Sequence, residues 1–85
     1  MREEKIGEVA KYFAKVSVAG VRIETGSLRI GDTIRIKGHT TDFTQRVDSM
    51  QLDNLPIESA AAGQLVGIKV RERVREKDEV FKVEE

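Results

Sequence analysis

Apolar residues recur at every second position in short runs along this chain. No stretch repeats them at a helical spacing for long enough to predict a stable α-helix. The clearest run is 32–37, where Ile34 and Ile36 alternate with Arg35 and Lys37. Because successive side chains of a strand point to opposite faces, this alternation predicts strands that are buried on one side. We expect one all-β domain over residues 1–85, with its core over about residues 6–83.

Polar breaks divide the chain into six expected strands, at residues 6–13, 16–23, 32–37, 42–52, 65–70 and 80–83. Shifts in the apolar phase predict one bulge at Gly20 and another near Asp48–Ser49. Short strands joined by polar or charged turns are typical of barrels, in which closure removes exposed edges. The sequence therefore predicts a six-stranded antiparallel closed or split β-barrel.

The connections carry expectations of their own. Leu28 and Ile30, set between two glycines, are expected to cap one end of the barrel. In the loop 53–63, Pro56 and the residues after it predict one helical turn. The run 71–78 alternates positive and negative charges, which favours a solvated hairpin turn.

The residue sets that catalysis or metal binding would need are incomplete. The chain has no cysteine, and His39 is its only histidine, so a zinc site has too few ligands. Gly26–Thr33 has the spacing of a phosphate-binding loop, but Asp32 stands where that loop needs lysine, and a strand pattern follows where it needs a helix. We expect a protein that is not an enzyme and that binds no cofactor and no metal.

The absence of cysteine also favours a reducing compartment. No run of 18 apolar residues exists, and the first residues lack the apolar stretch of a signal peptide. A cytoplasmic protein without a membrane segment is the expectation.

Charge gives a first indication of a binding face. Fifteen basic and fifteen acidic residues cancel over the chain, but residues 11–46 hold seven Lys and Arg against three Asp and Glu, a net charge of +4. Such a segment is either a phosphate-binding face or an ordinary solvated surface. Tyr12 and Phe13 are adjacent, so one of them should leave the core. Residues expected in an RNA-binding or partner-binding face are Lys11, Tyr12, Lys15, Arg22, Arg35, Lys37, Phe43 and Arg46, with Tyr12 or Phe43 as the base-stacking residue.

Several segments together resemble the second domain of translational GTPases such as elongation factor Tu. Val21–Ile36 has that domain's strand, apolar pair, Gly-Asp and second strand. Ala62–Val70 is similar to its Ala-Gly-x-x-Val-Gly segment, and Lys77–Val80 to its closing Gly-Asp/Gln-x-Val, with Lys77 where the family has glycine. The resemblance covers nearly the whole chain and implies a six-stranded split barrel. It implies no GTP hydrolysis, because the GTPase domain is absent.

A closer resemblance is to the small barrel appended to collagenase-like peptidase-family proteins, and to short free-standing elongation-factor-like proteins. The residues that carry it are Gly7–Val9, Tyr12 and Phe13, Gly38–Gln45 and Val47–Gln51. The peptidase-type catalytic domain is absent from this sequence, so its activity is not carried over.

Two functions stay open at this point. One is a non-enzymatic binding module that associates with RNA or the translation machinery, whose binding should weaken steeply with salt. The alternative is a protein-interaction subunit that docks on a separate peptidase-like enzyme through apolar and aromatic residues, with little salt dependence. A homo-oligomer is compatible with both.

Overall fold

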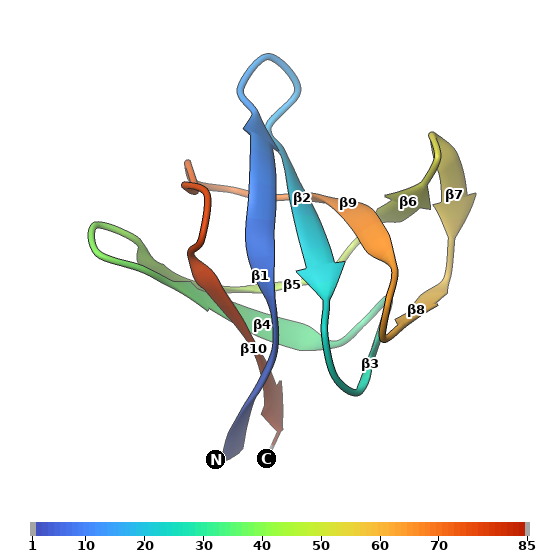
Figure 1. The fold of residues 1–85 in the computed structure, drawn as a ribbon, viewed down its shortest axis with the longest axis horizontal. Helices are drawn as coiled ribbons and strands as arrows, with labels where there is room; N and C mark the ends of the chain where they lie inside the picture. Colours follow the sequence, from blue (N-terminus) through green and yellow to red (C-terminus); the bar gives the residue numbers. More distant parts are fainter. Residues whose placement is uncertain (1, 85) are drawn as a thin grey trace.

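Strands and turns make up residues 2–84, the part of the chain described by the computed structural model, and no helix occurs there (Figure 1). No segment of these residues is therefore a helix long and apolar enough to cross a membrane. The all-β expectation is confirmed. The strands are β1 (Arg2–Phe13), β2 (Val18–Ile23), β3 (Ser27–Arg29), β4 (Thr33–Lys37), β5 (Asp42–Arg46), β6 (Met50–Leu52), β7 (Leu55–Ile57), β8 (Ser59–Ala61), β9 (Leu65–Lys69) and β10 (Glu79–Glu84).

Eight of the strands form one antiparallel sheet in the order β5-β4-β10-β1-β2-β9-β6-β7, and β3 pairs with β8 separately. The large sheet curls around a single core (Figure 1). Within residues 2–84 no backbone ladder joins its two edges, β5 and β7, so hydrogen bonds do not close it. The six-stranded closed barrel expected from the sequence is not confirmed. Its expected strand 42–52 ends at Arg46 and resumes at Met50, because the chain leaves β4 there and pairs with β9 instead.

The longest strand, β1, has two bulges. Its pairing register shifts so that Ile6 is an extra residue against β10 and Ala10 is an extra residue against β2. The bulge expected at Gly20 is therefore on the opposite strand, while β2 itself runs in regular register. Bulges bend a strand and increase its twist, which lets β1 follow the curl of the sheet along its whole length.

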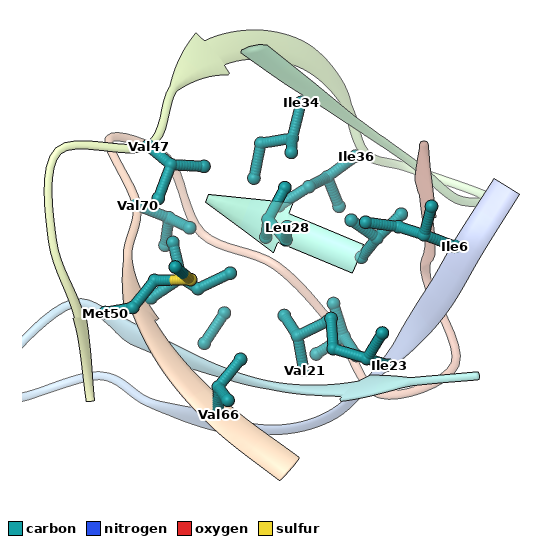
Figure 2. Close-up of a cluster of buried hydrophobic side chains, with 14 of the residues drawn as sticks. Ile6, Val21, Ile23, Leu28, Ile34, Ile36, Val47, Met50, Val66 and Val70 are labelled. Atoms are coloured by element: carbon teal, nitrogen blue, oxygen red, sulfur yellow. The ribbon is translucent and has the colours of Figure 1, made fainter. Parts of the chain in front are cut away.

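Aliphatic side chains from nearly every strand fill the core (Figure 2). Ile34 and Ile36 point inward, as their alternation predicts. The β3–β8 ribbon carries Leu28 into the middle of the cluster, where its side chain is fully buried (Figure 2). Of the pair expected to cap the barrel, Leu28 is thus buried in the core, whereas Ile30 turns outward and is exposed.

The loop 53–63 contains no helical turn, and this prediction is wrong. Asp53 and Asn54 have φ of 52° and 66° and form a two-residue hairpin between β6 and β7, the conformation that twisted hairpins favour. Pro56 lies in β7, an edge strand of the sheet. Edge strands tolerate proline, which has no N–H to donate, because one of their sides has no partner strand. Of the alanines that suggested a helix, Ala60 and Ala61 belong instead to β8, paired with β3, and Ala62 lies in the turn that follows.

The charged run 71–78 is not wholly solvated. Val74 and Asp78 are buried within it. The Asp78 carboxylate accepts a hydrogen bond from the Arg75 N–H at 2.9 Å, which offsets the cost of removing it from water.

Two side chains bridge the opening between β5 and the end of β9: Arg71 donates from Nη2 to the carbonyl oxygen of Thr44, and Gln45 makes two hydrogen bonds across it. The buried Gln45 donates from Nε2 to the carbonyl oxygen of Lys69 at 2.8 Å, and its Oε1 accepts from the N–H of Arg71 at 2.8 Å. A side-chain amide thus takes the place that a backbone ladder would occupy in a closed barrel.

Candidate functional site

A groove of about 460 Å³ lies on the outer face of the sheet between two hairpins. Its floor is formed by β2 and β9. The β1–β2 turn borders it at Val16, and the β6–β7 turn borders it at Asp53 and Asn54. Both turns project on the side of the molecule opposite the chain ends (Figure 1).

The floor is low because two glycines face each other across it. Gly20 of β2 pairs with Gly67 of β9, and the row continues to Lys11 on β1 and Gln51 on β6. Of four outward positions across four strands, the middle two therefore have no side chain. Glycine inside a strand often marks a place where another group approaches the backbone closely.

The two glycines differ in what their surroundings demand. A Cβ on Gly67 would lie 3.2 Å from Cγ1 of Val18, so local packing already favours glycine there. A Cβ on Gly20 would come no closer than 3.5 Å to any neighbour, which is ordinary contact, and its φ is not positive. Neither space nor backbone conformation requires glycine at position 20. Gly20 is itself buried, and the lack of a side chain there keeps the floor of the groove low.

Exposed apolar side chains form the walls. Phe13, Val16 and Leu65 are 45%, 58% and 51% exposed, and Val18, opposite Phe13, is half-buried. The Nζ of Lys11 lies 5.2 Å from the centroid of the Phe13 ring, a cation–π contact. Apolar side chains gathered around one hollow and bordered by polar residues are a mark of interaction sites.

Three cationic side chains lie beside these walls. Lys11 lines the groove, Arg22 pairs across the strands with Leu65, and Lys69 pairs with Val18. None of the three cations has a carboxylate within 4.0 Å in the described part of the chain. The rim of the groove is therefore predominantly basic.

The residues expected from the sequence to form a binding face do not form one patch. Lys11 and Arg22 lie on the groove face, and Lys15 is exposed in the β1–β2 turn. Tyr12 is half-buried against the core, so Phe13 is the aromatic residue that leaves it. The other four expected residues belong to the β4–β5 hairpin: Arg35, Lys37, Phe43 and Arg46.

On that hairpin, Phe43 and Arg35 are engaged elsewhere. Phe43 is 7% exposed and belongs to the core, so its ring faces are not available to stack on a base. Arg35 donates from Nε and Nη2 to the two oxygens of Asp42, both at 2.8 Å, and from Nη1 to Glu3 at 3.0 Å. The hydrogen bonds from Arg35 lower the pKa of Asp42. Lys37 and Arg46 are exposed, and Arg46 lies 3.8 Å from Asp48.

The glycine-bearing segment 26–33 forms a turn around Asp32. The Asp32 carboxylate accepts from the N–H of Arg29 at 2.9 Å and lies 3.4 Å from Nζ of Lys82. Among residues 2–84, no group of three or more His, Cys, Asp or Glu side chains is placed to hold a metal ion.

Sequence reasoning missed Phe13, Gly20 and Leu65 as site residues. Adjacency showed that Tyr12 or Phe13 must leave the core, but not which. The apolar phase shift at Gly20 predicted a bulge, whereas in the structure Gly20 pairs with Gly67 and forms the floor of the groove. That pairing joins residues 47 positions apart, so no local pattern could reveal it.

Comparison with known proteins gives the family. The profile of elongation factor Tu domain 2 matches residues 17–79. The chain belongs to this family. The elongation factor Tu domain 2 fold also agrees with a solved structure, the C-terminal domain of a protein described as a U32 peptidase from Geobacillus thermoleovorans. The two superpose with a TM-score of 0.87 at 23% identity, over 95% of this chain and 93% of that one, and the likeness shows a common fold.

Curated relatives of this elongation factor Tu domain 2 chain are larger proteins. A collagenase of Porphyromonas gingivalis is 38% identical over 78 residues, which cover 91% of this chain and 22% of that protein. An uncharacterized protease of Methanocaldococcus jannaschii is 41% identical over 85 residues, 99% of this chain and 21% of that protein. The chain thus spans about a fifth of the length of these relatives. Both resemblances noted in the sequence, to the translation-factor domain and to the peptidase-family barrel, are confirmed.

Proposed function

We propose that this chain is a non-enzymatic protein-binding module that docks on the catalytic part of a peptidase-family protein. The observation that carries the proposal is its match, over 91% of its length or more, to about a fifth of a collagenase and of a protease. In those proteins a barrel of this kind accompanies a much larger polypeptide, which is the natural candidate for its partner. Catalysis is assigned to that partner.

The surface of the molecule suits this role. A standard interface covers about 800 Å² on each partner, roughly a seventh of the 5550 Å² that the chain exposes. The groove supplies exposed apolar side chains, and the burial of apolar surface is the main favourable contribution to most protein–protein association. The location in a reducing cytoplasm, expected from the lack of cysteine, stays a prediction.

RNA binding has weaker support. The expected cationic residues are dispersed over two faces, Arg35 is held by two carboxylates, and Phe43 is in the core. The relatives are named as peptidase-family proteins. RNA is therefore treated as the competing outcome of the test.

The test uses the M. jannaschii protease with the segment that matches this chain removed. Isothermal titration calorimetry should show a 1:1 complex between this chain and the truncated protease, with a Kd on the order of micromolar. The isolated matching segment of the protease is the positive control. The full-length protease is the negative control, because its own barrel should already occupy the docking surface.

Two results would count against the proposal. The first is binding of the truncated protease to its own segment but not to this chain. The second is equal binding of this chain to truncated and full-length protease, which would mean that the chain does not bind at the surface that the protease's own barrel occupies. Tight RNA binding that falls steeply between 50 and 200 mM salt, on the order of a thousandfold, together with no protease complex, would favour the RNA function instead.

A further inference from the structure

The groove between the β1–β2 and β6–β7 turns carries a more specific inference. We propose that it receives a protein segment with a large apolar side chain flanked by acidic residues. The inference rests on the proposed function, since the segment would belong to the peptidase-type partner. It adds the place of contact and the chemistry of what is bound.

The apolar part follows from the shape of the groove. Phe13 and Val18 form one wall, Leu65 forms the other, and the paired glycines leave a low floor between them. A Leu, Met or Phe side chain laid in this hollow would contact both walls and the backbone of β2 and β9. Burial of such a side chain together with the exposed walls removes apolar surface of both partners from water, which is the main favourable contribution to association.

The acidic part follows from charge complementarity. Lys11, Arg22 and Lys69 border the apolar walls and have no carboxylate oxygen within 4.0 Å in the described chain, although Glu8 lies across the strands from Arg22. Asp53 is the acidic residue that lines the groove. Carboxylates on either side of the bound apolar residue would meet the three cations, and complementary charge guides association and fixes orientation.

A protein segment fits better than a small polar ligand. Specific small-molecule sites place polar groups inside a hollow that covers most of the ligand. Among residues 2–84, every buried side-chain nitrogen or oxygen already has a hydrogen-bond partner. The groove also extends along the surface from one turn to the other, as a bound segment requires.

A matched pair of leucines tests the walls. Leu65 in the groove and Leu55 on β7 are 51% and 67% exposed, and Leu55 does not line the groove. Leu65→Ala should weaken binding of the truncated protease about tenfold, the size expected for an interface anchor, and Leu55→Ala less than about twofold.

A matched pair of arginines tests the rim. Arg22→Glu should weaken the complex at low salt, whereas Arg73→Glu, exposed outside the groove, should not.

Gly20→Val tests the floor without removing any group. Space exists for its Cβ, and valine is favoured in strands, so circular dichroism should show an unchanged fold and an unfolding midpoint no lower than that of the wild type. Binding should nevertheless fall at least about tenfold because the floor is filled. Gly20→Val that keeps full affinity in a folded protein would overturn the inference.

Amide chemical shifts of the ¹⁵N-labelled chain separate this inference from the proposed function. The probe is a synthetic peptide in which one leucine is flanked on both sides by glutamates, and the control peptide has lysines in their place. The glutamate peptide should shift the amides of Gly20, Leu65 and Gly67, and the lysine peptide should not. These shifts without a protease complex would support the groove and reject the peptidase partner. A protease complex that is insensitive to Leu65→Ala and Gly20→Val would support the partner and reject the groove, and the absence of both signals would reject both.

Discussion

Arg29–Asp32 and Arg75–Asp78 form turns with the same hydrogen bonds. In each, the Asp N–H donates to the Arg carbonyl oxygen, at 3.0 and 3.1 Å, and the Asp carboxylate accepts from the Arg N–H at 2.9 Å. The third residue of each turn has a positive φ, 100° for Gly31 and 74° for Lys77. Glycine adopts this conformation freely, whereas lysine is strained in it. The positive φ explains why the family's motif has glycine at this position and why Lys77 is strained there.

We expect Lys77→Gly to raise the free energy of unfolding by about 0.5–1 kcal/mol, because relief of the strain exceeds the extra flexibility of the unfolded chain. The reverse experiment is Gly31→Ala, whose Cβ has room, with its nearest neighbour at 3.9 Å. It should lower the free energy of unfolding by about 1 kcal/mol through φ alone. Urea unfolding of both variants gives the two values. A loss of stability in Lys77→Gly would show that contacts of the lysine outweigh its backbone strain.

Gly7 and Gly20, on the paired strands β1 and β2, differ in the space around them. A Cβ on Gly7 would overlap the carbonyl oxygen of Arg22, whereas one on Gly20 meets only ordinary contacts. Gly7→Ala should therefore destabilise by about 3 kcal/mol, at the upper end of the cost of overpacking. Gly20→Ala should be neutral or stabilise by up to about 1 kcal/mol, because glycine weakens a strand interior. Thermal unfolding of the two variants side by side provides the comparison, and equal losses would refute this account of position 20.

Among the elements, the β4–β5 hairpin is tied to β1 by charge as well as by β10. Arg35 of β4 joins Asp42 of β5 and Glu3 of β1, and its side chain is partly covered. Bidentate arginine–carboxylate pairs are the more effective kind of ion pair. This network uses one of the three arginines that the sequence suggested for phosphate binding.

The network should make stability depend on pH in acid. The pKa of Asp42 is lower in the folded than in the unfolded protein because Arg35 donates hydrogen bonds to its carboxylate. Its contribution is therefore complete above the unfolded-state pKa of about 4 and is lost as the pH falls through the folded-state pKa. The stability difference between the wild type and Asp42→Asn should be constant near neutral pH and vanish in strong acid. Asp53→Asn, in the exposed β6–β7 turn, is the control. A difference that persists unchanged in strong acid would mean that the loss in Asp42→Asn is not due to charge.

The molecule as a whole is an open sheet whose β5 edge is tied back to the end of β9 by side chains. The β5 edge has no ladder to β9 within residues 2–84, and Gln45 bridges the two with both ends of its amide. On the other side, β1 and β10 bring the two chain ends together, with Arg2 paired to Glu84 (Figure 1). The groove lies by the opposite end of β1, so a partner bound there would not meet the chain ends.

Gln45→Met should cost about 1–3 kcal/mol, because the shape of the side chain is kept while the Arg71 N–H and the Lys69 carbonyl lose their partner. Gln51→Met, at an exposed position of β6, is the matched control and should change stability by less than about 0.5 kcal/mol. Hydrogen exchange adds a specific readout, since the amide of Arg71 should exchange faster in Gln45→Met. An unchanged exchange rate there would show that the bridge does not close the barrel in solution.

Much of this fold can be read from local patterns. Alternation at 32–37 correctly predicted Ile34 and Ile36 inside and Arg35 and Lys37 facing outward, because the two-residue period of a strand depends only on its own backbone. The family motifs were recognisable for a similar reason, since the turns at Gly31 and Lys77 depend on local backbone conformation. The lack of a long helical window was likewise enough to give an all-β chain.

The candidate site could not be read in this way. Its floor exists because β2 pairs with β9, its wall depends on Phe13 rather than Tyr12 facing out, and the bulge lies at Ala10 instead of Gly20. The first is a choice of partner between segments distant in the sequence, and the other two are choices of register within the β1–β2 hairpin. Register is set by the packing of whole strands against a common core, so alternation fixes the two faces of a strand, while the assembled sheet determines which outward residues meet.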